Sequence, residues 1–236
     1  SNYDPKKIKK NIMEKLNPIS KKLYKIYYFL FKERFSKKID FKFDNVFRWD
    51  LIEYLDNKYK FSNYLEVGCN DDELFSKIKI KNKIGIDPVI GGNMKVTSDD
   101  FFLQNKKNYD CVFIDGLHIY DQVKRDIVNS SKCLSENGFI LVHDCLPRSL
   151  SAQAVPRYRF NWNGDVWKAI VDLRRDPNLE IFTCLADEGI AVIQNKKNSN
   201  TPKIDKKISD LKFKDFYYNY EEYMRPISFS EFKDKY

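Results

Sequence analysis

The sequence predicts an α/β protein with a Rossmann-like, doubly wound and mostly parallel sheet of seven strands. Short apolar runs alternate with stretches of helical spacing between residues 64 and 144, a pattern typical of βαβ units. Two later runs, 180–186 and 189–194, are joined by the tight turn Asp187-Glu188-Gly189. The sheet should therefore finish with an antiparallel C-terminal hairpin strand, and basic N-terminal helices should precede it.

The predicted elements follow one another in a regular order along the chain. Residues 5–35 indicate one or two basic helices, whose apolar face combines Leu23, Ile26, Tyr27, Leu30 and Phe31. A second amphipathic helix covers 47–59, and the clearest later helix covers 120–134. Parallel strands are predicted at 64–68, 83–87, 109–115 and 139–144, with one more before Thr97.

The charge of the chain is concentrated at one end. Residues 1–40 contain twelve Lys/Arg and four Asp/Glu, so this segment accounts for the whole net charge of +8. We predict a basic helical arm over 1–45, a catalytic domain over 46–197, and an aromatic-rich extension over 198–236 that packs on that domain. The arm should pack on the domain or on a second subunit, as in a homo-oligomer, or contact an anionic surface. A neutral catalytic domain argues against nucleic acid as the substrate.

Cysteine usage and hydropathy indicate where the protein works. The five cysteines are scattered and contain no CxxC pair, which suggests a reducing compartment. We recognise neither a signal peptide nor an apolar run of membrane-spanning length. The expected location is the cytoplasm.

The loop after the first strand indicates the type of cofactor. Gly68 is its only match to a GxGxxG dinucleotide motif, and Asn70 is followed by three acidic residues, Asp71, Asp72 and Glu73. Carboxylates at a helix start would repel a pyrophosphate. They suit the sulfonium and ammonium groups of S-adenosylmethionine (SAM), so the loop favours SAM over NAD.

Further cofactor contacts are expected at the carboxyl edge of the sheet, where ligands bind in open α/β folds. Asp87 closes the second strand about twenty residues on and can accept two hydrogen bonds from a ribose diol. The alternative is an Asp that caps a turn before Pro88. Ser98 and Asp99 lie in the stretch expected to hold the adenine.

Six segments, taken in order, resemble a class I SAM-dependent methyltransferase family whose members often occur in carbohydrate and natural-product gene clusters. The segments are YLEVGCN, KIGIDP, TSDDFF, YDCVFIDGLHIYDQVKRDI, LSENGFILVHDCLP and WNGDVWKAI. The resemblance runs from about Arg48 to Gln194, and its DGLH and HDCLP blocks are the most specific. It implies a SAM-dependent methyltransferase, with Glu66, Gly68 and Asp87 at SAM-binding positions.

The only two histidines of the chain, His118 and His143, both follow predicted strands. A neutral imidazole can remove the proton of an alcohol during methyl transfer, so we assign His118 as the general base; the alternative is a capping or packing histidine. Asp115 and Asp144 end neighbouring strands, and two such carboxylates repel unless a cation lies between them. Related sugar O-methyltransferases hold a divalent metal here with an Asp-Gly-x-His segment and an acidic pair.

This chain has His143-Asp144 where those relatives carry two acidic residues. We assign Asp115, Asp144 and His143 as candidate ligands of Mg²⁺ or a similar ion, and Asp115 also as part of the catalytic and cofactor region. His143 is otherwise a packed neighbour, because adjacent strand residues point to opposite faces.

A later aromatic segment is expected to form the acceptor pocket. Trp162, with Arg157 upstream and Asp165 downstream, suits a sugar, nucleotide-sugar or glycan acceptor; Trp162 could equally close the core, and Asp165 is also expected to cap the helix that follows. The predicted function is sugar O-methylation. The alternatives are methylation of nucleic acid or another small molecule, a non-catalytic SAM-binding subunit, and a metal-dependent hydroxylase.

Overall fold

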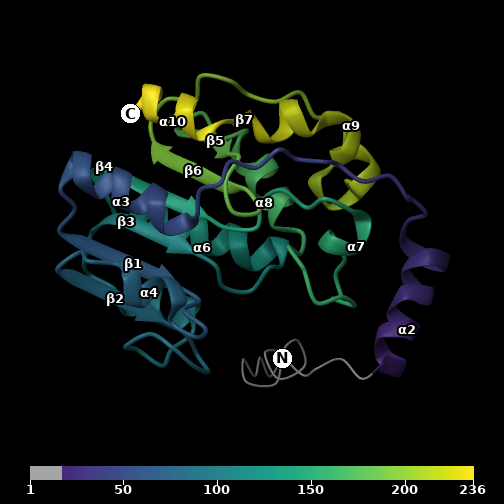
Figure 1. Cartoon of the computed structure of the whole chain (residues 1–236), viewed down its shortest axis with the longest axis horizontal. Helices are drawn as coiled ribbons and strands as arrows, with labels where there is room; N and C mark the ends of the chain where they lie inside the picture. Colours follow the sequence, from purple (N-terminus) through teal and green to yellow (C-terminus); the bar gives the residue numbers. More distant parts are fainter. Residues whose placement is uncertain (1–17) are drawn as a thin grey trace.

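A computed structural model of the chain describes residues 18–236, and residues 1–17 of the predicted basic arm lie outside the described residues. A seven-stranded sheet forms the centre, in the order β2-β1-β3-β4-β6-β5-β7 (Figure 1). Its strands are β1 (Asn63–Val67), β2 (Asn82–Ile86), β3 (Tyr109–Ile114), β4 (Leu134–Val142), β5 (Leu179–Cys184), β6 (Ile190–Asn195) and β7 (Pro226–Ile227). All run parallel except β6, which is antiparallel to β4 and β5. The predicted Rossmann-like fold is confirmed.

The seventh strand does not come from the segment that the sequence indicated. The strand expected before Thr97 is reduced to a single bridge between Ile86 and Met94. The backbone amides of Asn93 and Met94 both donate to Gly85 O. These amides are therefore bonded within a turn and are not available to pair with a neighbouring strand. The seventh strand is instead β7, which pairs with Thr183 and Cys184 of β5.

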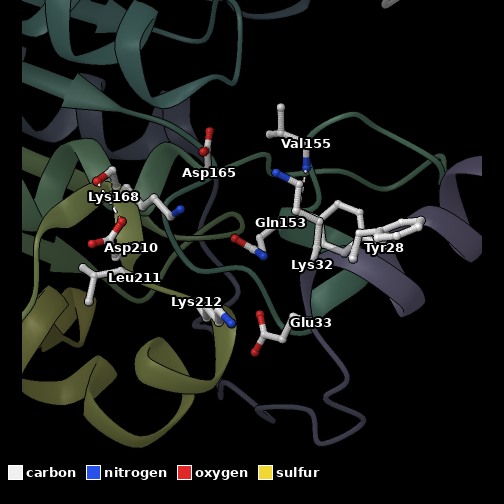
Figure 2. Close-up of a pocket in the computed structure, with 12 residues that line it drawn as sticks. Tyr28, Lys32, Glu33, Gln153, Val155, Asp165, Lys168, Asp210, Leu211 and Lys212 are labelled. Atoms are coloured by element: carbon white, nitrogen blue, oxygen red, sulfur yellow. Dashed lines mark hydrogen bonds between the residues drawn. The ribbon is translucent and has the colours of Figure 1, made fainter.

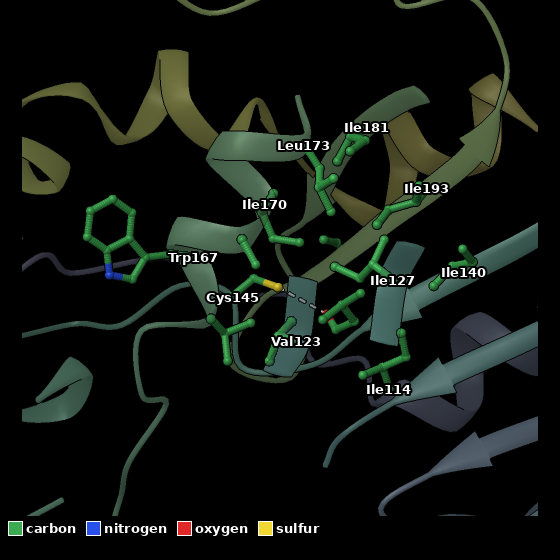
Figure 3. Close-up of a cluster of buried hydrophobic side chains, with 14 of the residues drawn as sticks. Ile114, Val123, Ile127, Ile140, Cys145, Trp167, Ile170, Leu173, Ile181 and Ile193 are labelled. Atoms are coloured by element: carbon green, nitrogen blue, oxygen red, sulfur yellow. Dashed lines mark hydrogen bonds between the residues drawn. The ribbon is translucent and has the colours of Figure 1, made fainter. Parts of the chain in front are cut away.

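Helices cover both faces of the sheet because the strand side chains alternate between two apolar clusters. In β4, Ile140 and Val142 belong to one cluster, and Phe139 and Leu141 to the other. The first cluster packs against α5 (Ser98–Gln104), α6 (Tyr120–Lys132), α8 (Val166–Leu173) and α9 (Phe213–Met224), and Figure 3 shows part of it. The second packs against α3 (Arg48–Tyr59), α4 (Glu73–Lys77) and α10 (Phe229–Lys235).

The C-terminal extension wraps the β5 edge of the sheet. After the 3₁₀ turn η2 (Ile208–Asp210), α9 lies on one face and α10 on the other, with β7 between them. Arg225, which lies between α9 and β7, ties the extension to β5, because its guanidinium lies 2.6 Å from Glu180 Oε1. Aromatic residues fill both contacts, with Phe216 of α9 and Phe232 of α10 fully buried.

The helix α2 (Pro18–Tyr27) of the basic arm stands apart from the sheet (Figure 1). It is followed by the π-helical turn η1 (Tyr28–Lys32), whose Tyr28 is buried, and by residues 33–45, which run along the domain with Ile39 and Phe41 in the first apolar cluster. No residue of α2 is buried, and its predicted apolar face stays exposed, with Leu23 at 59% and Phe31 of η1 at 72%. The expected packing of this face on the domain is therefore not seen; contact with a second subunit or an anionic surface stays a prediction. Within residues 18–236, no helix has the length and hydropathy to cross a membrane.

Candidate active site

The ends of β3 and β4 bring together the four side chains that were predicted to take part in catalysis or metal binding. They are Asp115, His118, His143 and Asp144. Ile114 is paired with Val142 in the sheet, so Asp115 and the pair His143-Asp144 leave the same edge. His118 lies on the loop that leads from β3 to α6. Because parallel strands share their carboxyl edge, residues about 28 positions apart meet here; Asp115 Oδ1 lies 3.3 Å from His143 Nδ1.

His118 lies between the two carboxylates. Its Nε2 is 2.9 Å from Asp115 Oδ1, and its Nδ1 is 3.2 Å from Asp144 Oδ2. Nδ1 also lies 3.3 Å from the carbonyl oxygen of Trp162, whose ring stacks on the imidazole at 5.4 Å. All these neighbours are hydrogen-bond acceptors, so they favour a ring that carries both protons.

The electrostatics of the cluster agree with this geometry. Burial alone would lower the pKa of His118, but the charge of Asp144 and the hydrogen bond to Asp115 outweigh it, so the pKa is raised. The same carboxylates hold the pKa of His143 well above its usual range against the effect of burial. Burial would raise the pKa of Asp115, yet the two imidazoles hold it far below its usual range. For Asp144 burial prevails, and its pKa is raised.

A second layer of ionic groups supports the cluster, and the sequence did not single it out. The Nη1 of Arg48 lies 3.2 Å from His143 Nε2, and its Nη2 lies 2.7 Å from Glu73 Oε2. Asp187 Oδ2 lies 3.5 Å from His143 Nε2. A sequence signal existed for Asp187: the turn after β5 must lie at the carboxyl edge, because β5 is parallel to β4. Arg48 has no such signal, since its partners are 25 to 139 residues away.

The side chains that could hold a metal differ from the predicted set. One ligand atom from each of Asp115, His118 and Asp144 lies within 4.8 Å of the others, whereas His143 directs its Nε2 at Arg48 and Asp187. The geometry thus adds His118 to the two carboxylates, while the Nδ1 of His143 also lies 3.3 Å from Asp115 Oδ1 and 3.7 Å from Asp144 Oδ2. Counting protonated histidines and Lys77, which lies 3.8 Å from Glu73 Oε1, four cationic groups face four carboxylates across the whole cluster. Asp115 and Asp144 would repel one another once the histidines lose their protons, which suits a cation between them.

Two glycines set the backbone around this cluster. Gly68 has φ +91°, and a Cβ there would lie 2.4 Å from the carbonyl oxygen of Asp115. Gly164 has φ +65°, and a Cβ there would lie 1.8 Å from the carbonyl oxygen of His118. Both residues need the left-handed conformation and the missing side chain, so each fixes how closely a neighbouring loop approaches the site.

The predicted ribose carboxylate is in place but covered. Asp87 is 1% exposed and accepts hydrogen bonds from the backbone amides of Val89, Ile90 and Asn70. The segment 88–93 also contacts the turn after β1, where Gly92 N donates to Asp72 Oδ1. The structure therefore confirms the alternative weighed from sequence, in which Asp87 caps the turn that follows it; binding of a ribose stays a prediction.

The other predicted cofactor residues lie around the same edge. Ser98 and Asp99 begin α5 and approach the side-chain amide of Gln122, whose Nε2 is 3.1 Å from Ser98 Oγ. Glu66 is buried, accepts from the hydroxyl of Tyr64 at 2.7 Å, and has its pKa raised to about 7 by burial. Asn70 remains exposed on the turn, with φ +49°.

The predicted acceptor residues belong to two different surroundings. Trp162 stacks on His118 and donates from Nε1 to Ala154 O at 2.6 Å, and the guanidinium of Arg157 lies over its ring at 5.5 Å. Asp165 does not make the expected cap on α8; its Oδ1 accepts from Tyr120 N, the first residue of α6, at 2.7 Å. The missed residue here is Asn163, which donates to Asp144 Oδ1 at 2.8 Å.

The chain is similar to known proteins in part of its sequence and in its fold. Residues 86–145, about a quarter of the chain, match the model of a family described as a methyltransferase domain, and this stretch contains Asp87, Asp115, His118 and Asp144. A Podospora anserina methyltransferase solved with S-adenosylhomocysteine (SAH) is 13% identical, with 84% of this chain and 98% of that chain covered and a TM-score of 0.49. A Bacillus cereus O-methyltransferase in complex with SAH is 8% identical over 74% and 97% of the two chains, with a TM-score of 0.47. No curated protein matches the sequence.

Proposed function

We propose that the chain is a SAM-dependent O-methyltransferase whose acceptor is a hydroxyl of a sugar or glycan. The observation that carries the proposal is the position of His118 between Asp115 and Asp144, at the carboxyl edge of a Rossmann-like sheet. The methyltransferase-domain match over residues 86–145 supports it. Trp162, stacked beside His118, supports a sugar, since flat aromatic faces pack against sugar rings.

The residues of this edge fit SAM by the chemistry of their side chains. The turn after β1 carries Asp71, Asp72 and Glu73 and no basic residue, which suits the positive sulfonium and ammonium groups. Gly68 keeps the turn close to the backbone of Asp115. Asp87 would bind the ribose diol once segment 88–93 has moved, with Ser98 and Asp99 beside the adenine.

His118 would receive the proton of the acceptor hydroxyl. Bound SAM supplies a methyl group on positively charged sulfur. The acceptor oxygen would form the new O–CH₃ bond as the S–CH₃ bond broke with its electron pair left on sulfur, and the hydroxyl proton would pass to an unprotonated nitrogen of His118. Added positive charge at this edge lowers the raised pKa of His118, which prepares the imidazole to act as a base. Asp115 orients the ring through Nε2.

A divalent cation would bind between the two carboxylates of the cluster. We assign Asp115 and Asp144 as its ligands, since both carboxylates face His118 within 3.2 Å and hard oxygen ligands suit Mg²⁺. A bound cation supplies a Lewis acid that lowers the pKa of the acceptor hydroxyl. His143, held by Arg48 and Asp187, then positions Asp115 from behind.

The experiment that tests this proposal follows tritiated methyl groups from SAM into a panel of uridine and thymidine diphosphate sugars. RNA is added in a parallel reaction, and each reaction is repeated with EDTA and again with Mg²⁺ restored. We expect label in a sugar hydroxyl, loss of at least about tenfold in rate with EDTA, and recovery with Mg²⁺. Label only in RNA would overturn the acceptor class, and an unchanged rate in EDTA would remove the cation.

A further inference from the structure

A cavity of about 490 Å³ lies beside the candidate active site (Figure 2). Its walls come from four segments far apart in the sequence: η1, the chain after α7 (Leu150–Gln153), the start of α8, and the junction of η2 with α9. It adjoins the methyl-transfer site through one turn. Asp165 lines the cavity, and the preceding Gly164 lies against the backbone of His118.

Three lysines face this cavity without a direct ion pair, and three carboxylates, those of Glu33, Asp165 and Asp210, line the same space. The lysines are Lys32, Lys168 and Lys212, and within residues 18–236 none of their ammonium groups forms a salt bridge or a hydrogen bond. Burial lowers the pKa of Lys168, although the charges of Asp165, Glu33 and Asp210 act in the opposite direction. A partly desolvated ammonium group without a direct partner is costly, so an anion that enters the cavity would stabilise Lys168.

The acidic residues of the cavity are largely occupied by other donors. Glu33 accepts at its two oxygens from the backbone amides of Phe213 and Lys214, at 2.9 and 2.8 Å. Asp165 accepts from Tyr120 N, and Asp210 from Ser209 Oγ. These bonds hold α9 and α6 in place, while the carboxylates keep their charge, so a bound anion would compete with them for the ammonium groups.

Neutral donors add to the same surface. Gln153 accepts from Trp167 at its Oε1, 3.1 Å away, which leaves its amide nitrogen as a donor toward the cavity. Figure 2 shows this amide and the ammonium group of Lys168 directed into the space between the four segments. Ammonium and amide donors around one cavity are the groups that bind phosphoryl oxygens.

We propose that this cavity binds a phosphate or diphosphate group of the acceptor. The proposal rests on the proposed methyltransferase function and narrows its substrate to a phosphorylated sugar or a sugar nucleotide. The acceptor hydroxyl would lie at His118, the sugar ring beside Trp162, and the phosphoryl group beyond Asp165 among the three lysines.

The test measures binding of inorganic pyrophosphate by calorimetry, without SAM and without an activity assay. Lys168→Met and Lys212→Met each remove one ammonium group, and Lys214→Met is the matched control, because Lys214 lies two residues from Lys212 but outside the cavity lining. We expect each cavity variant to weaken pyrophosphate binding about tenfold or more, as for loss of a charge-assisted hydrogen bond, with the control unchanged. Equal affinities in wild type and both cavity variants, or no wild-type binding at millimolar pyrophosphate, would overturn the proposal.

Two further ligands identify the source of the phosphoryl group. Tighter binding of uridine diphosphate than of glucose 1-phosphate assigns the cavity to sugar nucleotides, and the reverse order assigns it to sugar phosphates. SAH affinity measured on the same samples tests the methyltransferase function separately from the anion site. Pyrophosphate binding that survives in a protein unable to bind SAH would reject the methyltransferase function and leave the anion site standing.

Discussion

His118→Ala should lower the rate of methyl transfer by about 10²- to 10⁴-fold, the usual contribution of a general base. The affinity for SAH should stay within about threefold of wild type, because His118 contacts Asp115, Asp144 and Trp162 and not the residues assigned to the ribose or adenine. Single-turnover rates with labelled SAM and calorimetry with SAH measure the two effects separately. A variant that transfers methyl groups at the wild-type rate would contradict the assignment of the base.

The pH dependence gives a second readout of the same group. The pKa of His118 is raised in the folded protein, so the base is protonated and inactive at low pH. The rate should therefore rise with pH through a limb that lies above about pH 6.5, the ordinary histidine value. As the site is coupled to His143 and two carboxylates, this limb reports the whole cluster. The same raised pKa means that His118 stabilises the fold most below about pH 6.5, and this contribution is lost as pH rises through its folded pKa.

Gly164→Ala should destabilise the fold by about 3 kcal/mol. A Cβ at this position meets the backbone of His118 at 1.8 Å, and φ is +65°, so overpacking adds to the cost of a left-handed alanine. In a chain of this length the melting temperature should fall by roughly 6 to 12 °C. Thermal unfolding followed by circular dichroism measures the change.

Gly116→Ala is the matched control for that substitution. Its Cβ would meet only ordinary contacts, the nearest being 3.6 Å from Val67 Cγ1, so the melting temperature should change by no more than about 2 °C. If the two variants melt at the same temperature, the close approach of Gly164 to His118 does not contribute to stability as described.

The main features of the sheet follow from local sequence patterns. Alternating apolar runs predicted β1, β2, β3 and the β5–β6 hairpin to within a few residues, because each strand has two buried faces and a distinct turn. The prediction of a strand before Thr97 was wrong for a local reason. The backbone amides of Asn93 and Met94 donate to the carbonyl oxygen of Gly85 and form a turn there. The β7 strand could not be foreseen, since two residues carry no periodicity and depend on the long-range contact of Pro226 and Ile227 with β5.

The candidate site shows a similar division. Residues directly after strands, such as Asp115 and Asp144, could be placed together because parallel strands share one edge. The residues that bond to Asp115, Asp144 and their neighbours could not be predicted in this way. Arg48 and Asn163 reach the cluster from a helix start and a loop, over separations of 95 and 19 residues, and only the packing of helices on the sheet sets such contacts.

Calorimetry with SAH and, separately, with NAD⁺ measures which of the two cofactors the chain binds. The acidic turn after β1, the proposed ribose-binding role of Asp87 and the cluster around His118 together predict binding of one SAH per chain and no binding of NAD⁺. Asp87→Asn should weaken SAH binding by about tenfold, in line with the loss of a charged hydrogen-bond acceptor. Binding of NAD⁺ without binding of SAH would contradict the account.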